Sequence, residues 1–231
     1  MPQTGFSTWR TVGRLSGMSL LSRLMAPFRS RPADPGADAL APAQWLVIGL
    51  GNPGGKYAGT RHNIGYLVTD RLVERTDADA LRGVPGTKAQ VARVEIDGHG
   101  VLLVRSTTYM NLSGEAVAPL ATSYGISPDH VIVIHDELDL PVGKVKVKLG
   151  GNENGHNGLK SISAELGTRD YVRVRVGIGR PAAGTGVIDH VLTPLDDDTD
   201  WDVATDTAAD AVDITVTRGL SAAQNEIHSR A

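Results

Sequence analysis

The sequence predicts a single α/β domain, in which a central mixed, mostly parallel sheet is flanked by helices. Short apolar runs alternate along the chain with segments whose apolar residues recur at helical spacing, which is typical of strands connected by helices. A chain of 231 residues is long enough for one sizeable core but short for two. No apolar run approaches the ~18 residues of a membrane-spanning helix, so no membrane segment is predicted.

Each predicted element follows from a local pattern. Apolar runs such as VIVI are typical of buried strands, whereas KVKVKL alternates in period two. We expect Asp97–Gly98 to join two neighbouring strands, Ser113 to cap a helix, and Pro119 to kink that helix because proline has no backbone donor. In chain order the predicted elements are a strand at 45–50, a helix at 62–76, strands at 90–96 and 101–106, a helix at 113–125, strands at 131–134 and 144–149, a helix at 157–167, a strand at 171–179, and helices from 196 and 221.

The composition excludes some classes of site. With no cysteine, the chain has no disulfide and no thiolate metal site, which fits a reducing compartment. The formal net charge of −3 does not by itself indicate a nucleic-acid partner. The charges are unevenly spread, however, and an average of this kind can conceal a basic patch.

Residues 1–43 differ in composition from the remainder. Five arginines precede the first acidic residue, Asp34, and a stretch rich in proline, alanine and glycine follows. We interpret this segment as a disordered basic N-terminal extension and linker, and residues 44–231 as the α/β domain. An organelle transit peptide, which is also arginine-rich and poor in acids, is the alternative.

The segment GLGNPGG, from Gly49 to Gly55, has the Gly-x-Gly-x-x-Gly spacing of a dinucleotide-binding loop. Its context does not fit, because such a loop opens directly into a helix whose amides bind the pyrophosphate. Here Pro53 interrupts the loop and the helix begins only near residue 60, while the acid at ribose-binding distance, Asp70, falls inside that helix. A dinucleotide-binding oxidoreductase is therefore excluded, and Asn52 becomes the residue that the glycines present to a ligand.

Polar side chains gather where predicted strands end and helices begin. In an open α/β sheet, the loops at the carboxyl ends of the parallel strands meet in one crevice, where ligands bind. The residues placed near this edge are two histidines, one carboxylate and several carboxamides: Asn52, His62, Asn63, Asn111, Asp136, His156 and Asn157.

This set contains no serine or cysteine nucleophile, so it favours a reaction of water. A neutral imidazole, whose unperturbed pKa is about 6.5, takes a proton from water near pH 7. A carboxylate partner fixes its tautomer, and carboxamides donate hydrogen bonds to a carbonyl oxygen as it becomes an oxyanion. The residues therefore predict water-mediated hydrolysis of an ester or amide without a covalent intermediate.

Taken singly, these residues have simpler explanations that stay open. Asn52 would serve a tight turn, and His62 would be a polar surface residue in the first turn of a helix. His156 would be an ordinary polar loop residue. A divalent-cation site is the alternative for the residues that end the buried strand and follow it, which are His135, Asp136, Glu137 and Asp139.

Five segments, in order, resemble the signature segments of bacterial peptidyl-tRNA hydrolases: IGLGNPGGKYAGTRHNIGY, TTYMNLSG, HDELDLPVG, GHNGLKSI and RVRVGIGRP. The likeness runs from about residue 45 to the C-terminus. It implies a single α/β domain that cleaves the ester between a peptide and its tRNA, with no metal and no organic cofactor. It also implies a cytoplasmic monomer that recycles tRNA, without membrane association or an obligate protein partner.

By matching positions, the resemblance implies a role for each candidate residue. His62 corresponds to the catalytic base and Asp136 to the acid that orients it. Asn52 and Asn111 correspond to carboxamides that hold and polarise the substrate. The remaining matches are Asn157 for the water or oxyanion, His156 for the peptide or tRNA end, and Tyr57 and Met110 for the lining of the cleft.

Two of the predicted strands carry basic residues on one face. Strand alternation groups the basic residues of each strand, which are Lys144, Lys146 and Lys148 in the first and Arg173 and Arg175 in the second. Such faces are most often simply solvated, but together they would form a phosphate-binding patch despite the acidic total. The resemblance implies that Lys148 and Arg175 clamp the 5′-phosphate of tRNA.

The chain departs from the family pattern in the loop GGNENGHNG, where Asn152 and Asn154 occupy positions at which glycine is common. If these positions need a left-handed backbone, asparagine tolerates it better than most residues, at some cost. The altered loop makes a non-catalytic RNA-binding relative on the same fold the alternative function. The presence of both His62 and Asp136 favours the enzyme.

Overall fold

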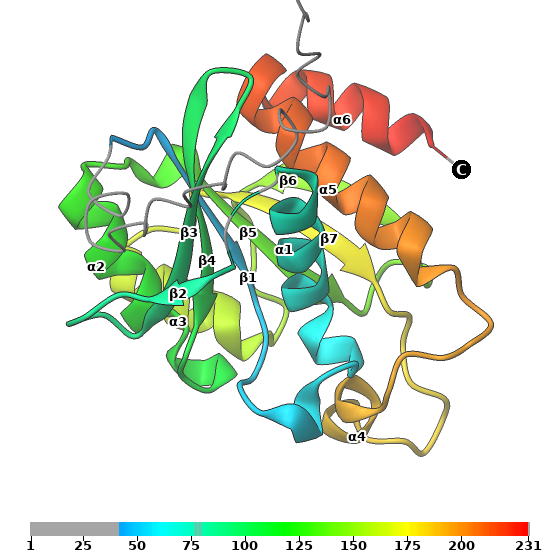
Figure 1. Cartoon of the computed structure of the whole chain (residues 1–231). Helices are drawn as coiled ribbons and strands as arrows, with labels where there is room; N and C mark the ends of the chain where they lie inside the picture. Colours follow the sequence, from blue (N-terminus) through cyan, green and yellow to red (C-terminus); the bar gives the residue numbers. More distant parts are fainter. Residues whose placement is uncertain (1–41, 77, 79, 231) are drawn as a thin grey trace, which may run out of the picture. The chain divides into compact units, whose positions relative to one another are not determined.

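The structure, a computed structural model, describes residues 42–76, 78 and 80–230. The predicted N-terminal extension at 1–43 lies outside the described residues, except for Pro42 and Ala43. From residue 44 onward the chain forms an α/β domain in which a twisted sheet lies between helices (Figure 1).

In the described part of the chain, the sheet contains seven strands: β1 (Trp45–Gly49), β2 (Arg82–Gly83), β3 (Ala89–Ile96), β4 (His99–Ser106), β5 (Val131–Glu137), β6 (Val145–Leu149) and β7 (Val172–Gly177). Their order is β2-β3-β4-β1-β5-β7-β6. The central strands β4, β1, β5 and β7 run parallel to one another. The edge pairings of β2 with β3, β3 with β4, and β6 with β7 are antiparallel. The predicted mixed sheet with a parallel centre is confirmed.

The α-helices found among the described residues are α1 (Ile64–Arg75), α2 (Gly114–Tyr124), α3 (Asn157–Leu166), α4 (Val187–Leu192), α5 (Trp201–Arg218) and α6 (Leu220–Ser229). Figure 1 shows α1 and α5 on one side of the sheet and α2 and α3 on the other. Successive side chains of a central strand point to opposite faces of the sheet, so each strand contributes residues to both core layers. In β1, Leu46 and Ile48 belong to the core beneath α2 and α3, whereas Val47 belongs to the core beneath α1 and α5. Burial on both faces explains why these strands read as continuous apolar runs.

Some local details differ from expectation or were not predicted. The elements β2 and α4 were not predicted, because two and six residues are too few to display a periodic pattern. Ser113 does stand at the start of α2, but its hydroxyl donates to the carbonyl of Met110 at 2.8 Å instead of accepting from the helix. The helix expected from residue 196 begins at Trp201. α2 continues through Pro119 as far as Tyr124.

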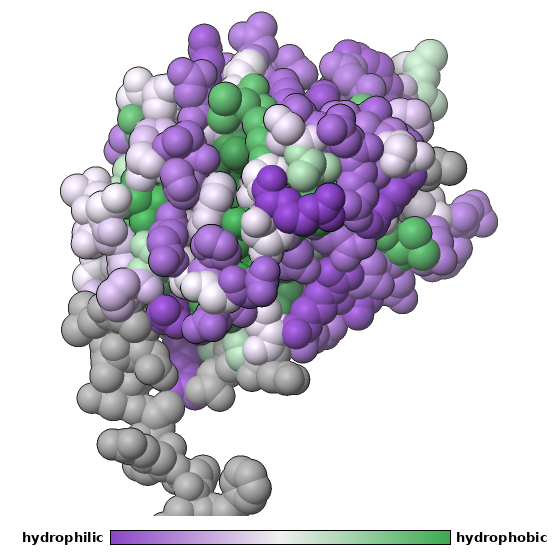
Figure 2. All heavy atoms as spheres, turned by 90° about the horizontal axis from the view of Figure 1, so that it is seen from above, coloured by the Kyte–Doolittle hydropathy of each residue, from purple (hydrophilic) through white to green (hydrophobic). Residues whose placement is uncertain are grey.

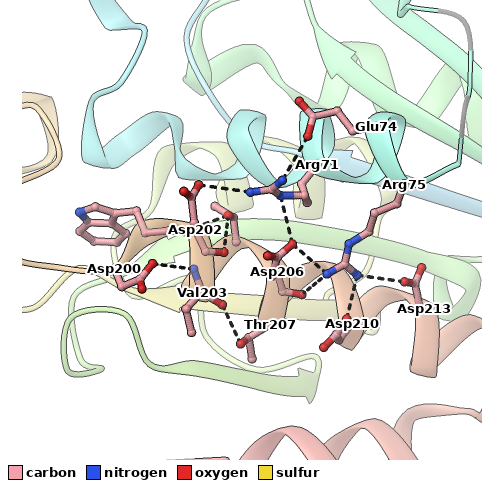
Figure 3. A network of polar contacts seen from close by, with 12 residues as sticks. Arg71, Glu74, Arg75, Asp200, Asp202, Val203, Asp206, Thr207, Asp210 and Asp213 are labelled. Atoms are coloured by element: carbon pink, nitrogen blue, oxygen red, sulfur yellow. Dashed lines mark hydrogen bonds and ion pairs between the residues drawn. The ribbon is translucent and has the colours of Figure 1, made fainter.

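The acidic residues of α5 pair with two arginines of α1. Arg71 and Arg75 of α1 point toward the aspartates of α5 (Figure 3). Arg75 contacts three carboxylates at N–O distances of 2.7 to 3.3 Å, those of Asp206, Asp210 and Asp213. Solvent screens each single pair, but the network joins the two helices that cover the same face of the sheet.

None of the helices in the described ranges combines the length and the hydrophobicity that crossing a membrane takes. The face of the molecule in Figure 2 is mainly hydrophilic, with hydrophobic residues exposed in limited areas. Most large apolar side chains of the described residues lie instead in the two core layers.

Candidate active site

The structure brings His62 and Asp136 together, although they are 74 residues apart in the sequence. His62 lies in a 3₁₀ turn (Arg61–Asn63) directly before α1, and Asp136 is the penultimate residue of β5. The distance between His62 Nδ1 and Asp136 Oδ1 is 2.9 Å. A carboxylate accepts hydrogen bonds, so Nδ1 carries the proton and Nε2 keeps its lone pair for a substrate proton.

Gly65, in the first turn of α1, allows this helix to approach the strand ends. A Cβ at this position would lie 2.4 Å from the backbone nitrogen of Leu50 and 2.6 Å from the carbonyl oxygen of Ile134. Only glycine permits backbone contacts of this kind. The close approach places His62, three residues earlier, at the carboxyl end of β5 beside Asp136.

His156 hydrogen-bonds to the same carboxylate oxygen as His62. It does so through Nε2, whereas His62 uses Nδ1, so the two rings are in opposite tautomers. Its Nδ1 faces the backbone N–H groups of Gly158 (3.2 Å) and Leu159 (3.4 Å) at the start of α3, so Nδ1 accepts and Nε2 carries the proton. Its Nε2 lies 3.0 Å from Oδ1 of Asp136. The resemblance implied only a contact of His156 with substrate, and this second donor to Asp136 was not predicted.

Burial and charge act in opposite directions on this group. Burial alone would raise the pKa of Asp136, but the adjacent His62 and His156 hold that pKa far below its usual range. Burial alone would lower the pKa of His62, but the Asp136 carboxylate and its hydrogen bond outweigh burial and raise that pKa above 6.5. Asp136 is therefore an anion at neutral pH and stabilises the protonated form of His62.

The cation site considered for the end of β5 does not assemble. Glu137 contacts Arg175, and Asp139 contacts Arg180. Ligand atoms of His62, Asp136 and His156 do lie within 4.8 Å of one another, a spacing that a metal site also needs. In this structure these atoms are engaged with one another, because both imidazoles hydrogen-bond to the Asp136 carboxylate.

His135 is a buried histidine whose setting the sequence did not disclose. Its Nδ1 donates to the Asp136 carbonyl at 2.7 Å, and its ring centroid lies 5.1 Å from that of His156. Burial lowers the pKa of His135 well below its usual value, so the ring is neutral. His135 therefore packs behind the site as an uncharged support. In the sequence, its only sign was a polar residue at the end of the apolar run VIVI.

Asn52 is buried in the loop after β1, where Met110 fixes its side-chain amide and Asn63 fixes its backbone. Its Oδ1 accepts from the backbone N–H of Met110 at 2.8 Å. Because the amide oxygen is occupied, the Nδ2 group remains as the donor for a ligand. Asn63 holds the Asn52 backbone through two bonds of 2.9 Å, one to its N–H and one to its carbonyl. The sequence placed Asn63 at the same edge of the sheet but did not predict a role for it in the site.

A cleft of about 970 Å³ is lined by the polar residues of the site and by the apolar side chains of α4. Tyr57 and the two clamp residues do not line the cleft. Tyr57 instead contacts a lining residue, Tyr109, edge to face at 6.4 Å between ring centroids. The predicted site residues that the cleft brings together are Asn52, His62, Met110, Asn111, Asp136, His156 and Asn157.

Arg173 holds the loop that precedes His156, in which Asn152 and Asn154 stand at positions where glycine is common. The Arg173 side chain is fully buried, and its guanidinium donates to the carbonyls of Gly151 (2.8 Å) and Asn152 (2.7 Å). The expectation of an exposed basic face at Arg173 is therefore wrong, because the loop folds over it. Asn154 has φ 48°, whereas Asn152 is not left-handed, so only one of the two asparagines takes the conformation that favours glycine.

Lys148 and Arg175 lie on the same face of neighbouring strands, where Lys146 pairs with Arg175 and Lys148 with Arg173. Arg175 is held by the buried carboxylate of Glu137. Burial lowers the pKa of Lys148, and so do the nearby guanidiniums of Arg175 and Arg173. The predicted pair thus belongs to a cationic group that runs along β6 and β7, with Arg175 level with His135 of β5.

Comparison with known proteins identifies the family. The family model described as peptidyl-tRNA hydrolase matches residues 46–231. The chain is 53% identical over 216 residues to peptidyl-tRNA hydrolase 2 of Corynebacterium glutamicum, covering 94% of this chain and 100% of the relative. It is 49% identical over 186 residues to the peptidyl-tRNA hydrolase of Nocardia farcinica, covering 79% and 95%.

A solved structure agrees with the sequence relatives. The crystal structure of peptidyl-tRNA hydrolase from Acinetobacter baumannii superposes with a TM-score of 0.76 at 35% identity, covering 82% of this chain and 97% of that chain. The residues that the family model matches include every residue that lines the cleft. The chain belongs to the peptidyl-tRNA hydrolase family and has peptidyl-tRNA hydrolase activity.

Proposed function

We propose that His62 is the general base of this hydrolysis and that Asp136 orients it. His62 Nε2 takes a proton from water, and the resulting hydroxide adds to the carbonyl carbon of the ester between peptide and tRNA. The tetrahedral intermediate collapses, the terminal ribose oxygen of tRNA leaves, and His62 returns the proton to that oxygen. The observation that carries the proposal is the 2.9 Å hydrogen bond from His62 Nδ1 to a buried carboxylate, which leaves Nε2 as the acceptor.

We assign the carboxamides to the carbonyl oxygen and the peptide. Asn52 directs its Nδ2 group to the oxyanion, an assignment supported by the engagement of its Oδ1 with Met110. Asn157 opens α3 beside His156 and positions the water or the oxyanion, while Asn111 holds the substrate on the other wall. Met110 lines the part of the cleft that receives the peptide, and Tyr57 acts only through its contact with the lining residue Tyr109.

We assign Lys148 and Arg175 to the 5′-phosphate of the tRNA. Both are basic side chains on one face of β6 and β7, and neither lines the catalytic cleft. A phosphate contact outside the cleft positions the RNA without touching the ester. We further expect the enzyme to act in the cytoplasm as a monomer without a cofactor. The non-catalytic RNA-binding alternative gains no support from a site in which base, acid and carboxamides lie together.

The test compares hydrolysis of N-acetyl-aminoacyl-tRNA with that of the unacetylated aminoacyl-tRNA. The wild-type protein should cleave only the acetylated ester, and His62→Ala should lose at least ~100-fold in kcat because the base is removed. His99→Ala is the matched control, since His99 begins β4 and does not line the cleft. Retention of the wild-type rate by His62→Ala would refute the assignment of the base.

A further inference from the structure

Glu137 is a buried acid next to the basic residues of β6 and β7, and the mechanism above does not use it. It is the last residue of β5, directly after Asp136, and is 5% exposed. Its Oε2 accepts from both Nε (2.9 Å) and Nη2 (2.8 Å) of Arg175. The carboxylate thus contacts one of the two side chains assigned to the 5′-phosphate.

The carboxylate is itself fixed in place. Its other oxygen, Oε1, accepts from the backbone N–H of Asp139 at 3.1 Å, so both oxygens are engaged. A guanidinium has five N–H donors in a rigid plane, and holding Nε and Nη2 fixes that plane. The Nη1 donors are not used by Glu137 and remain for another acceptor.

Arg175 stands in a group of like charges. Lys146 lies opposite it in register, and Lys148 and Arg173 are the next pair along the strands. Like charges at this spacing repel one another, and an arginine side chain without a partner loses rotamer entropy when it binds a ligand. A buried carboxylate offsets both effects before any phosphate arrives.

We propose that Glu137 is a positioning residue for tRNA recognition, which preorganises Arg175 to receive the 5′-phosphate. The inference rests on the proposed role of Lys148 and Arg175. Glu137 follows Asp136 on β5 and lines the cleft, so it connects the cleft wall to Arg175. Glu137 therefore affects how tightly the RNA binds and leaves the chemistry at the ester to other residues.

The experiment uses N-acetyl-aminoacyl-tRNA with and without its 5′-phosphate. Glu137→Ala should raise KM for the phosphorylated substrate roughly 5- to 10-fold, the size of the net contribution of one ordinary hydrogen bond, with a much smaller change in kcat. Glu137→Gln should raise it less, because the amide oxygen still accepts from Arg175. For the substrate without the phosphate, the KM ratio of variant to wild type should be close to one. Glu95→Gln, an exposed acid on β3, is the charge-matched control.

Arg175→Ala separates failure of the inference from failure of the clamp. If Arg175→Ala raises KM only for the phosphorylated substrate and Glu137→Ala does not, the clamp stands and the role of Glu137 is wrong. If Arg175→Ala has no phosphate-dependent effect, the clamp itself is wrong and the inference fails with it. Lower KM in both Glu137 variants means that Glu137 competes with phosphate, and equal changes for both substrates mean a general structural role. Either result overturns the proposal. Should Glu137→Ala fail to fold, Glu137→Gln still tests it.

Discussion

The Nε2 atom of His156 lies 3.0 Å from Oδ1 of Asp136, the same oxygen that holds His62. The carboxylate thus has two imidazole donors in opposite tautomers, one from the turn before α1 and one from the cap of α3. This arrangement holds the acid by two separate segments of the chain, so that its orientation does not depend on His62 alone.

The first prediction concerns His156. His156→Ala removes one donor to Asp136 and the side-chain cap of α3, but it leaves the base in place. We expect kcat to fall by roughly 10-fold, well short of the loss in His62→Ala, because the effect is on positioning. Single-turnover hydrolysis of N-acetyl-aminoacyl-tRNA measures both. Equal losses in the two variants would mean that His156 itself takes part in proton transfer.

The second prediction concerns pH. His62 must be neutral to accept a proton, and its pKa is raised above 6.5 because Asp136 outweighs the effect of burial. The value of kcat/KM should therefore rise with pH through this raised pKa. Asp136→Asn removes the opposing charge, so the acid limb should move to lower pH while kcat falls roughly 100- to 10,000-fold. An acid limb that stays in place in Asp136→Asn would argue against His62 as the titrating group.

The third prediction concerns Asn63, which holds the backbone of Asn52. Asn63→Ala leaves a buried N–H and a buried carbonyl of Asn52 without their partners. We expect a loss of ~1–3 kcal/mol in the free energy of unfolding, together with a lower kcat because the Asn52 amide moves. Urea denaturation and steady-state kinetics measure the two effects. Asn225→Ala, on the exposed side of α6, should change stability by less than about 0.5 kcal/mol.

The fourth prediction concerns Arg173. Arg173→Met keeps an apolar body but leaves the carbonyls of Gly151 and Asn152 without donors, so we expect a destabilisation of about 2–4 kcal/mol. Hydrogen exchange should increase in the loop at 150–156 more than elsewhere. Arg218→Met, at the exposed end of α5, is the control. If the loop exchanges at the wild-type rate in Arg173→Met, the guanidinium does not support it.

The fifth prediction concerns the pairing of α1 with α5. Arg75→Gln removes contacts with three aspartates, but the side chain is partly exposed and the effect should be no more than about 1–2 kcal/mol. The difference in Tm between wild type and variant should shrink in 1 M salt, where the Debye length is about 3 Å. A difference that persists at high salt would assign the effect to packing of the arginine stem.

Much of the fold follows from local patterns. The apolar runs and period-two segments place β1, β3 to β7 and the longer helices, because burial of one face or both leaves its mark on neighbouring residues. Helix ends were harder to predict. Ser113 is a residue type that commonly caps a helix, but its hydroxyl donates to the carbonyl of Met110 and accepts no hydrogen bond from the helix. The short α4 left no periodic signal, although it supplies apolar side chains to the cleft.

The sequence by itself determined the α/β class and the candidate residues at the strand ends, because residue type and spacing are local properties. Only the tertiary structure decided their partners. His156 donates to Asp136, Arg173 is covered by its loop, and Glu137 holds Arg175, all through contacts between residues distant in the chain. The pattern along a strand states which side chains share a face. Whether that face meets solvent, a loop or a buried acid depends on the segments that return over it, and this sets the proton positions and charges of the site.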